Sequence, residues 1–172
     1  MPCNKPLVGY RAPNGGITPS RKESTGKLMS VPCGRCLGCQ IQYAQDWAVR
    51  CTHEETQHEK SSIITLTYAE HNYPPDGGLL HEDFQNFMRS LRVDSDPLRY
   101  FMVGEYGDAG PGHHPHFHAI MYGQDFADRT YWTTTDAKTI QYRSELLEKH
   151  WNLGHATLGD FSWEGAAYCA RY

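Results

Sequence analysis

The residues best suited to chemistry form the segment His116-Phe-His118. Residues 116–122 are dense in apolar and aromatic side chains, which predicts a strand. Residues two apart on a strand point to the same face, so both imidazoles project together while Phe117 turns into the core. Two neutral imidazoles on one face can begin a site for a divalent metal ion. The alternative is a pair of surface or packed histidines in a histidine-rich turn, because short motifs often occur by chance.

A carboxylate and two tyrosines extend this pattern. Glu105 ends a predicted strand at residues 98–105, and the turn-rich segment 107–115 would return the chain beside it. Tyr168 and Tyr172 are four apart on a predicted helix, so their phenols share one face, and Arg171 lies near that face. The tyrosines could simply pack an amphipathic helix. The metal pattern favours the interpretation that they are nucleophiles.

Four cysteines suggest a second metal site. Cys33, Cys36 and Cys39 form a CxxCxxC motif, and Cys3 would supply a fourth sulfur if the N-terminal arm folds back. Four thiolates suit a structural zinc ion. An iron–sulfur cluster is chemically feasible, and a reduced cysteine-rich turn without metal is the remaining alternative.

Composition excludes several classes of protein. The chain has 172 residues, a hydrophobic fraction of 39% and a net charge of −4, whereas proteins that coat duplex DNA are usually strongly basic. No stretch approaches the ~20 apolar residues of a membrane span. The N-terminus lacks the layout of a secretory signal, so we expect a cytosolic protein with reduced thiols.

The elements expected around these residues alternate between helix and strand. We predict an irregular arm over 1–32 and a loop or insertion over 124–139. Helices are expected over 41–57, 81–92 and 141–151 and from Ser162 onward, and strands over 62–68, 98–105, 116–122 and 154–161. Two adjoining strands form an expected hairpin. This order predicts an α+β fold, with an antiparallel sheet and helices packed on one face.

Three motifs in a fixed order resemble those of rolling-circle replication initiators of the HUH endonuclease superfamily. They are Thr65-Leu-Thr-Tyr68, then Gly104-Glu-Tyr-Gly107 with His116-Phe-His118, then Tyr168-Cys-Ala-Arg-Tyr172. Further segments resemble the replication initiation proteins of microviruses of the gokushovirus branch: Met1-Pro-Cys3, Pro6–Arg11, Val31–Cys39 and Trp47–Cys51. The resemblance spans nearly the whole chain.

The resemblance implies an RRM-like or ferredoxin-like endonuclease domain over residues 41–172, preceded by an arm over 1–40 that carries the zinc site. It implies Mn²⁺ or Mg²⁺ held by Glu105, His116 and His118. It also implies a tyrosine that attacks single-stranded DNA at a phage origin, leaving a 5′-phosphotyrosine and a free 3′-OH. The remaining implied roles are Tyr168 and Tyr172 as nucleophiles, Arg171 as their cationic neighbour, and Thr65, Thr67 and Tyr68 as DNA contacts.

Members of that family act in the host cytoplasm, with a host replication helicase as a further expected partner. They continue past the tyrosine helix, so we expect the sequence to be part of a longer protein. Many single-tyrosine relatives carry lysine where Arg171 stands.

Two other functions fit parts of the sequence. His114-Pro-His-Phe-His118 imitates the alternating histidines of histidine-triad nucleotide hydrolases, although Pro115 is a poor alternate member. That interpretation leaves Glu105 and both tyrosines unexplained. A zinc-stabilised module that binds single-stranded DNA without cutting it is the non-enzymatic alternative.

Overall fold

The computed structural model describes residues 3–75, 77–106 and 114–172. The predicted connector at 107–115 therefore lies mostly outside the described residues. The chain divides into two compact units, residues 1–46 with Arg171, and residues 47–170 with Tyr172. This division falls inside a helix, α1 (Leu37–Glu55). Among the described residues no helix combines the length and apolar character needed to cross a membrane.

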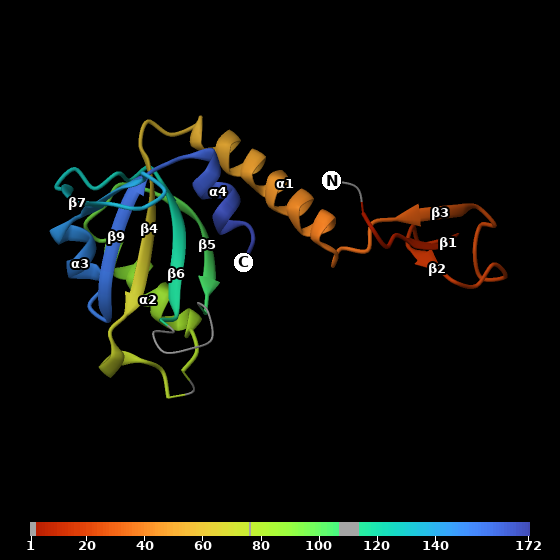
Figure 1. The fold of residues 1–172 in the computed structure, drawn as a ribbon, viewed down its shortest axis with the longest axis horizontal. Coiled ribbons are helices and arrows are strands. Elements are labelled where there is room, and N and C mark those ends of the chain that lie inside the picture. Colours follow the sequence, from red (N-terminus) through yellow and green to blue (C-terminus); the bar gives the residue numbers. More distant parts are fainter. Residues whose placement is uncertain (1–2, 76, 107–113) are drawn as a thin grey trace. The chain divides into compact units, whose positions relative to one another are not determined.

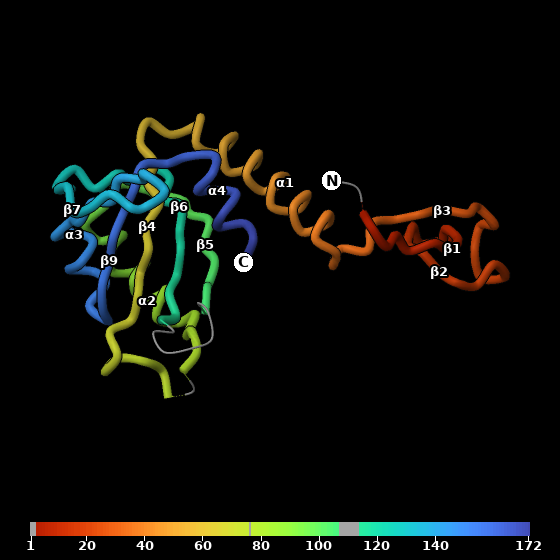
Figure 2. Tube along the Cα trace, viewed as in Figure 1, coloured from red at the N-terminus to blue at the C-terminus, as the bar shows by residue number. Residues whose placement is uncertain are grey.

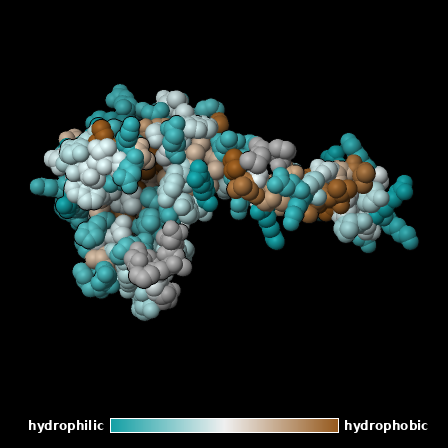
Figure 3. Space-filling model, viewed as in Figure 1, coloured by the Kyte–Doolittle hydropathy of each residue, from teal (hydrophilic) through white to brown (hydrophobic). Residues whose placement is uncertain are grey.

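The first unit holds a small antiparallel sheet where the sequence predicted an irregular arm. Its strands are β1 (Leu7–Arg11), β2 (Ile17–Thr18) and β3 (Leu28–Val31), in the order β2-β1-β3. The prediction was wrong because these strands bury almost nothing, and a strand without a buried face shows no alternating pattern. Figure 3 shows hydrophobic side chains exposed over this sheet, and Leu7, Val8 and Leu28 are all more than half exposed.

The second unit is built on a six-stranded antiparallel sheet, visible in Figures 1 and 2. The strand order is β5-β6-β4-β9-β8-β7. The bounds are β4 Ser61–Tyr68, β5 Arg99–Glu105, β6 His116–Tyr122, β7 Thr130–Thr134, β8 Ile140–Arg143 and β9 Gly154–Asp160. The α+β prediction is confirmed.

One face of this sheet packs on the main core. Along β4 the side chains alternate, with Ile64, Leu66 and Tyr68 at most 1% exposed and the residues between them partly exposed. Helices α2 (His81–Leu91) and α3 (Glu145–His150) cover the buried face through Phe84, Leu147 and their neighbours. Burial of these large apolar side chains is the main stabilising contribution.

The opposite face carries a smaller apolar cluster, so helices lie on both faces and the expectation of one covered face was wrong. The end of α1 contributes Ala48 and Cys51, and α4 (Trp163–Cys169) contributes Ala166 and Cys169. Only part of this face is covered. A polar strip of threonine and histidine side chains remains beside α4, formed by Thr65, Thr67, His116 and His118.

Two sequence predictions failed between β6 and β9. The expected loop at 124–139 contains β7, and the expected helix at 141–151 is divided into β8 and α3. Ser144 is the reason for the division, because its hydroxyl accepts a hydrogen bond from the Leu147 amide and caps α3. A 3₁₀ turn at Glu70–Asn72 follows β4.

Candidate metal and tyrosine site

Strand pairing brings three metal-binding side chains together. Glu105 on β5 is directly opposite His116 on β6, and His118 follows two residues later on the same face. The Glu105 Oε2 atom lies 3.1 Å from His118 Nε2 and 3.4 Å from His116 Nε2, and the two Nε2 atoms are 3.1 Å apart. The structure therefore assembles the triad that the sequence predicted.

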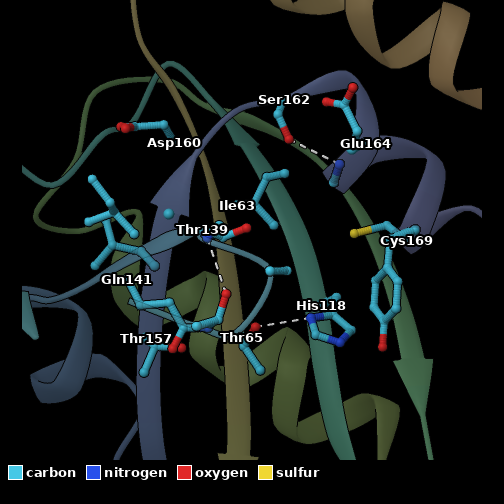
Figure 4. A pocket seen from close by; sticks show the side chains of 17 residues that line it. Ile63, Thr65, His118, Thr139, Gln141, Thr157, Asp160, Ser162, Glu164 and Cys169 are labelled. Atoms are coloured by element: carbon cyan, nitrogen blue, oxygen red, sulfur yellow. Dashed lines mark hydrogen bonds between the residues drawn. The ribbon is translucent and has the colours of Figure 1, made fainter. Parts of the chain in front are cut away.

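Both imidazoles are held by their other ring nitrogen. Nδ1 of His118 is 3.0 Å from the Thr65 hydroxyl on β4, a contact drawn in Figure 4. Nδ1 of His116 is 2.6 Å from the backbone oxygen of His114, which can only accept a hydrogen bond. An imidazole that donates from Nδ1 presents the lone pair of Nε2, the tautomer that binds a metal through Nε2. Both Nε2 atoms face Glu105.

The distances fit a divalent ion. Three ligands on adjacent corners of an octahedron lie about 3.0 Å apart when the metal–ligand bonds are about 2.1 Å. The observed separations of 3.1, 3.1 and 3.4 Å are close to that arrangement. Two histidines and one carboxylate on one side of an ion leave coordination positions open for a substrate.

The protonation of the triad also suits a metal. Burial lowers the pKa of His118, and the neighbouring His116 lowers it further, so this ring is neutral at neutral pH. Burial alone would raise the pKa of Glu105. The hydrogen bonds from Tyr168 and Tyr172 contribute most to outweighing burial, and the pKa of Glu105 is lowered. Neutral imidazole and ionised carboxylate are the forms that ligate metals.

Helix α4 places Tyr168 against this triad. The Ser162 hydroxyl accepts from the Gly165 amide and caps the helix. Gly165 permits close packing on β4, because a Cβ atom there would lie 2.4 Å from the Cδ1 atom of Ile63. The Tyr168 hydroxyl then donates a 2.8 Å hydrogen bond to Glu105 Oε2.

Tyr172 adds a second phenol in line with the first. The prediction placed both tyrosines on one helix, but α4 ends at Cys169 and Tyr172 follows it. Its hydroxyl still donates to that of Tyr168 at 3.3 Å. Burial, together with hydrogen bonds to Tyr172 and Glu105, raises the pKa of Tyr168 well above its ordinary value. The Tyr168 phenol is therefore protonated in the resting site.

The other predicted residues are placed unevenly. Thr67 shares a face with Thr65 and pairs with His116 across the strands. Tyr68 lies on the opposite face, 1% exposed, where its hydroxyl donates to Asp83 at 2.6 Å. Arg171 is exposed and forms no hydrogen bond or ion pair with other described residues. The structure thus brings the threonines to the site, but not Tyr68.

Two cavities lie on the polar strip, and the first of them reaches the triad at His118. The first, about 460 Å³, is shown in Figure 4 and is bounded by His118, Tyr168 and residues of the β7–β8 connection. The second, about 450 Å³, is lined by Trp132, Arg143 and His155. Sequence reasoning missed these three residues. Trp132, Arg143 and His155 belong to three different predicted elements, so no spacing in the sequence links them.

The four predicted cysteines meet within the first unit. All four Sγ atoms lie within 4.8 Å of one another, with Cys36 3.8 Å from Cys3 and 3.6 Å from Cys39. The Cys33 and Cys39 sulfurs are 4.0 Å apart. Corners of a four-sulfur zinc tetrahedron lie about 3.8 Å apart for bonds of about 2.3 Å. The cysteine arrangement therefore has the size of a zinc site.

Backbone amides donate hydrogen bonds to the cysteine sulfurs, as they do around metal-bound thiolates. The Cys33 amide donates to Cys3 Sγ at 3.3 Å, and the Cys36 amide donates to Cys33 Sγ at 3.4 Å. Gly34 adopts a φ of +74°, which the turn between these cysteines requires and glycine tolerates. Backbone amides at Asn4 and Cys39 lower the pKa of Cys36 to about 6.

Comparison with known proteins identifies relatives of the chain. The family model for replication-associated protein ORF2/G2P matches residues 61–172. Replication-associated protein VP4 of Bdellovibrio phage phiMH2K is 30% identical over 184 residues, covering 100% of this chain and 57% of that protein. Replication-associated protein ORF2 of Spiroplasma virus 4 is 27% identical, covering 100% and 60%. Replication-associated protein ORF4 of Chlamydia phage 1 is 28% identical, covering 83% and 37%.

The chain therefore spans less than two thirds of the length of these relatives. No solved structure matches it. The matched region begins with β4 and includes the triad, both tyrosines and both cavities. The match over residues 61–172 shows that the chain belongs to the family of replication-associated proteins ORF2/G2P.

Proposed function

We propose that the chain nicks single-stranded DNA at a phage replication origin by tyrosine attack. The observation that carries this proposal is the Tyr168 hydroxyl, 2.8 Å from the carboxylate of a triad with the dimensions of a metal site. A nucleophile that touches a metal ligand lies within reach of a phosphate bound at the same ion. The family match supports a role in replication.

The reaction exchanges one phosphodiester for another. The Tyr168 oxygen attacks the scissile phosphorus, a new P–O bond forms to tyrosine, and the P–O3′ bond breaks. The 5′ side of the strand stays on the protein as a phosphotyrosine, and the departing 3′ oxygen takes up a proton to become a free 3′-OH. The phenolic proton is released to solvent as the new bond forms, and the hydrogen bond to the ionised Glu105 holds the phenol in position.

Glu105, His116 and His118 would hold the divalent ion, which we infer to be Mn²⁺ or Mg²⁺. When bound, the ion supplies positive charge that polarises the scissile phosphate and stabilises the leaving oxygen. The chain's own contribution is orientation. Thr65 and the His114 carbonyl hold the two imidazoles, and α4 holds the phenol.

The paired hydroxyls support a relay of two cleavages. Tyr168 contacts Glu105 directly, whereas Tyr172 contacts Tyr168 and is 56% exposed. We therefore assign the first attack to Tyr168. Tyr172 then attacks the regenerated origin while Tyr168 still carries the first 5′ end, and the free 3′-OH closes the circle by reversing the first reaction. Arg171 serves as the exposed cation that balances phosphate charge.

Thr65 and Thr67 are the proposed DNA contacts on the open face of β4. They lie beside the triad, and Thr67 is partly exposed. We place the reaction in the host cytoplasm, with a host helicase unwinding the nicked duplex.

We also propose that Cys3, Cys33, Cys36 and Cys39 bind one structural zinc ion. The first unit needs a metal site to stabilise it, because it has almost no hydrophobic core. Its buried described residues are only Gly9, Gly38 and Ala44. A unit of this size without an apolar core is usually held by metal or disulfides. The cysteines form no disulfide, and their spacing fits the zinc tetrahedron.

The test of nicking is a covalent adduct on a denaturing gel. Protein with Mn²⁺ is incubated with single-stranded oligonucleotides that tile the origin of the encoding genome. We expect a slower protein band that disappears with EDTA, with His116→Ala and with Tyr168→Phe, and that persists with Tyr172→Phe.

Other outcomes point to other functions. Binding of DNA without any adduct, from protein shown to be folded, would replace the nickase with a single-strand-binding module. Phosphate hydrolysis that survives both chelation and the loss of both tyrosines would indicate a histidine-triad hydrolase.

A further inference from the structure

The second cavity contains an exposed tryptophan that the proposed chemistry does not use. Trp132 on β7 is 51% exposed and forms no ring contact with another described aromatic residue. An exposed tryptophan at a cavity offers a flat aromatic face on which a nucleic acid base can stack. This side chain is the starting point for a ligand site.

A strand irregularity aims Trp132 into the cavity. Tyr131 pairs with Tyr142 and Thr133 pairs with Gln141, so Trp132 is the extra residue of a bulge between β7 and β8. A bulge turns one side chain out of the regular alternation, and bulges are common beside active sites. Trp132 therefore lines the cavity together with residues of β4 and β9, although β7 is the edge strand.

The remaining lining matches the chemistry of a nucleotide. Arg143 uses its Nε to hold Glu148 at 2.6 Å, and its two terminal nitrogens have no partner among the described residues. His155 is exposed, and the floor is polar, formed by Thr65, Thr67 and Thr157. An aromatic face for a base, a cation for a phosphate and hydroxyls for polar edges are the usual components of single-strand recognition.

The floor is shared with the proposed catalytic site. Thr65 and Thr157 line both cavities, and the first cavity also contains His118 and Tyr168. The strand registers place His155 opposite Thr67, and Thr67 opposite His116, in one row across the sheet. With strands about 4.8 Å apart, that row puts His155 about 10 Å from His116. The second cavity is therefore near enough to the triad for one substrate strand to occupy both sites.

We propose that this cavity is a nucleotide subsite of the nicking site, in which one unpaired base of the substrate strand stacks on Trp132 while Arg143 and His155 bind its backbone phosphate. The volume of about 450 Å³ falls in the range of pockets that hold small organic ligands. The inference rests on the proposed nicking function. It adds the means by which the strand is held in register while Tyr168 attacks.

The experiment uses the origin oligonucleotide that the wild-type protein nicks. Binding to that oligonucleotide is measured by fluorescence anisotropy in EDTA, where no cleavage occurs. We expect Trp132→Ala to weaken binding on the order of 5- to 150-fold, the range for losing one stacked base. Trp132→Phe should retain most of the affinity. Tyr131→Ala is the matched control, because Tyr131 is the adjacent residue, 65% exposed, and is not part of the described lining.

Two further measurements identify the contact itself. With 5-iodouracil placed at each position in turn, ultraviolet crosslinking should attach Trp132 to one or two consecutive nucleotides near the nick. Arg143→Gln should lower the slope of log affinity against log salt by about one phosphate contact. Circular dichroism verifies that each variant is folded.

The outcomes separate this inference from the function on which it rests. If wild-type protein nicks DNA but Trp132→Ala and Trp132→Phe bind as wild type does, the subsite is wrong and the nickase stands. Equal losses in Trp132→Ala and Tyr131→Ala would also overturn the subsite. If no oligonucleotide is bound or nicked, both proposals fall together.

Discussion

Replacing Thr65 with valine should weaken metal binding without changing any ligand. The Thr65 hydroxyl is 3.0 Å from Nδ1 of His118, and Nε2 of that ring faces Glu105. Valine keeps the shape and the β-branching of threonine, so β4 should be preserved. What is lost is the acceptor that keeps the Nδ1 proton in place and the ring in its ligating orientation.

The size of the effect follows from burial. The His118 side chain is only 12% exposed, so water can replace the lost hydroxyl poorly. A net hydrogen bond of about 1 kcal/mol corresponds to about a 5-fold change in affinity. Removing an outer-shell partner of a metal-bound histidine typically costs 10- to 100-fold. We therefore expect Mn²⁺ to bind between about 5- and 100-fold more weakly.

Isothermal titration calorimetry with Mn²⁺ measures this change, and the rate of adduct formation at limiting Mn²⁺ should fall in parallel. Thr157→Val is the matched control, because Thr157 pairs with Thr65 on the same face and its hydroxyl has no partner among the described residues. Equal Mn²⁺ affinity in wild type and Thr65→Val would refute the argument that Thr65 orients His118. An equal loss of Mn²⁺ affinity in Thr157→Val would show that replacing either threonine hydroxyl with a methyl group disturbs the site.

Three further predictions concern stability and metal content. Tyr68→Phe should lower the free energy of unfolding by about 1 kcal/mol in urea denaturation, because it removes the hydrogen bond to Asp83, and should leave nicking unchanged. The metal-free protein should lose stability as pH falls below about 6.5. The pKa of His118 is lower in the folded than in the unfolded chain, so the unfolded chain binds the proton first. His118→Asn should flatten this pH dependence of stability between pH 7 and 5. Metal analysis should find one zinc per chain in the wild type and none in Cys36→Ser. In this variant the residues before Asp46 should become sensitive to protease while the six-stranded sheet persists. Equal zinc content in both proteins would contradict the proposed zinc site.

The parts of the fold that follow from sequence are those with a strong pattern of burial. β4 and β6 were recognised because β-branched and apolar side chains concentrate there, and α2 because Phe84, Phe87 and Met88 fall on one face. The three-stranded sheet of the first unit was missed since it buries no such side chains. There the backbone pairing, and not an apolar face, defines the strands.

The metal triad could be predicted because it depends on strand geometry alone. Alternation puts His116 and His118 on one face, and a hairpin puts Glu105 opposite them. The roles of Thr65 and of the His114 carbonyl depend on which nitrogen of each ring turns outward, and spacing does not encode that. The direction of Tyr68 was in principle readable from alternation, since it is an odd number of residues from Thr65 and Thr67.

The second cavity could not be predicted, because it depends on an extra residue in a strand. Residues 124–139 carry a high density of threonine and polar residues, which resembles a loop. The bulge at Trp132 breaks the alternation by which β7 could have been recognised. A functional irregularity of this kind removes the very signal that sequence reasoning uses.

The order of the strands has a consequence for the sequence in which the site assembles during folding. Glu105 pairs with His116 on β5 and β6, two strands that are close together along the chain. Thr65 on the central strand β4 pairs with Thr157 on β9, which comes much later in the sequence. Contacts between residues far apart in sequence form slowly, because closing a long loop costs entropy before the contact stabilises it. The metal ligands should therefore gather early in folding. The helix with Tyr168 follows the last central strand and docks after it, so a partly folded chain would bring Glu105 and the histidines together before the Tyr168 hydroxyl reaches them.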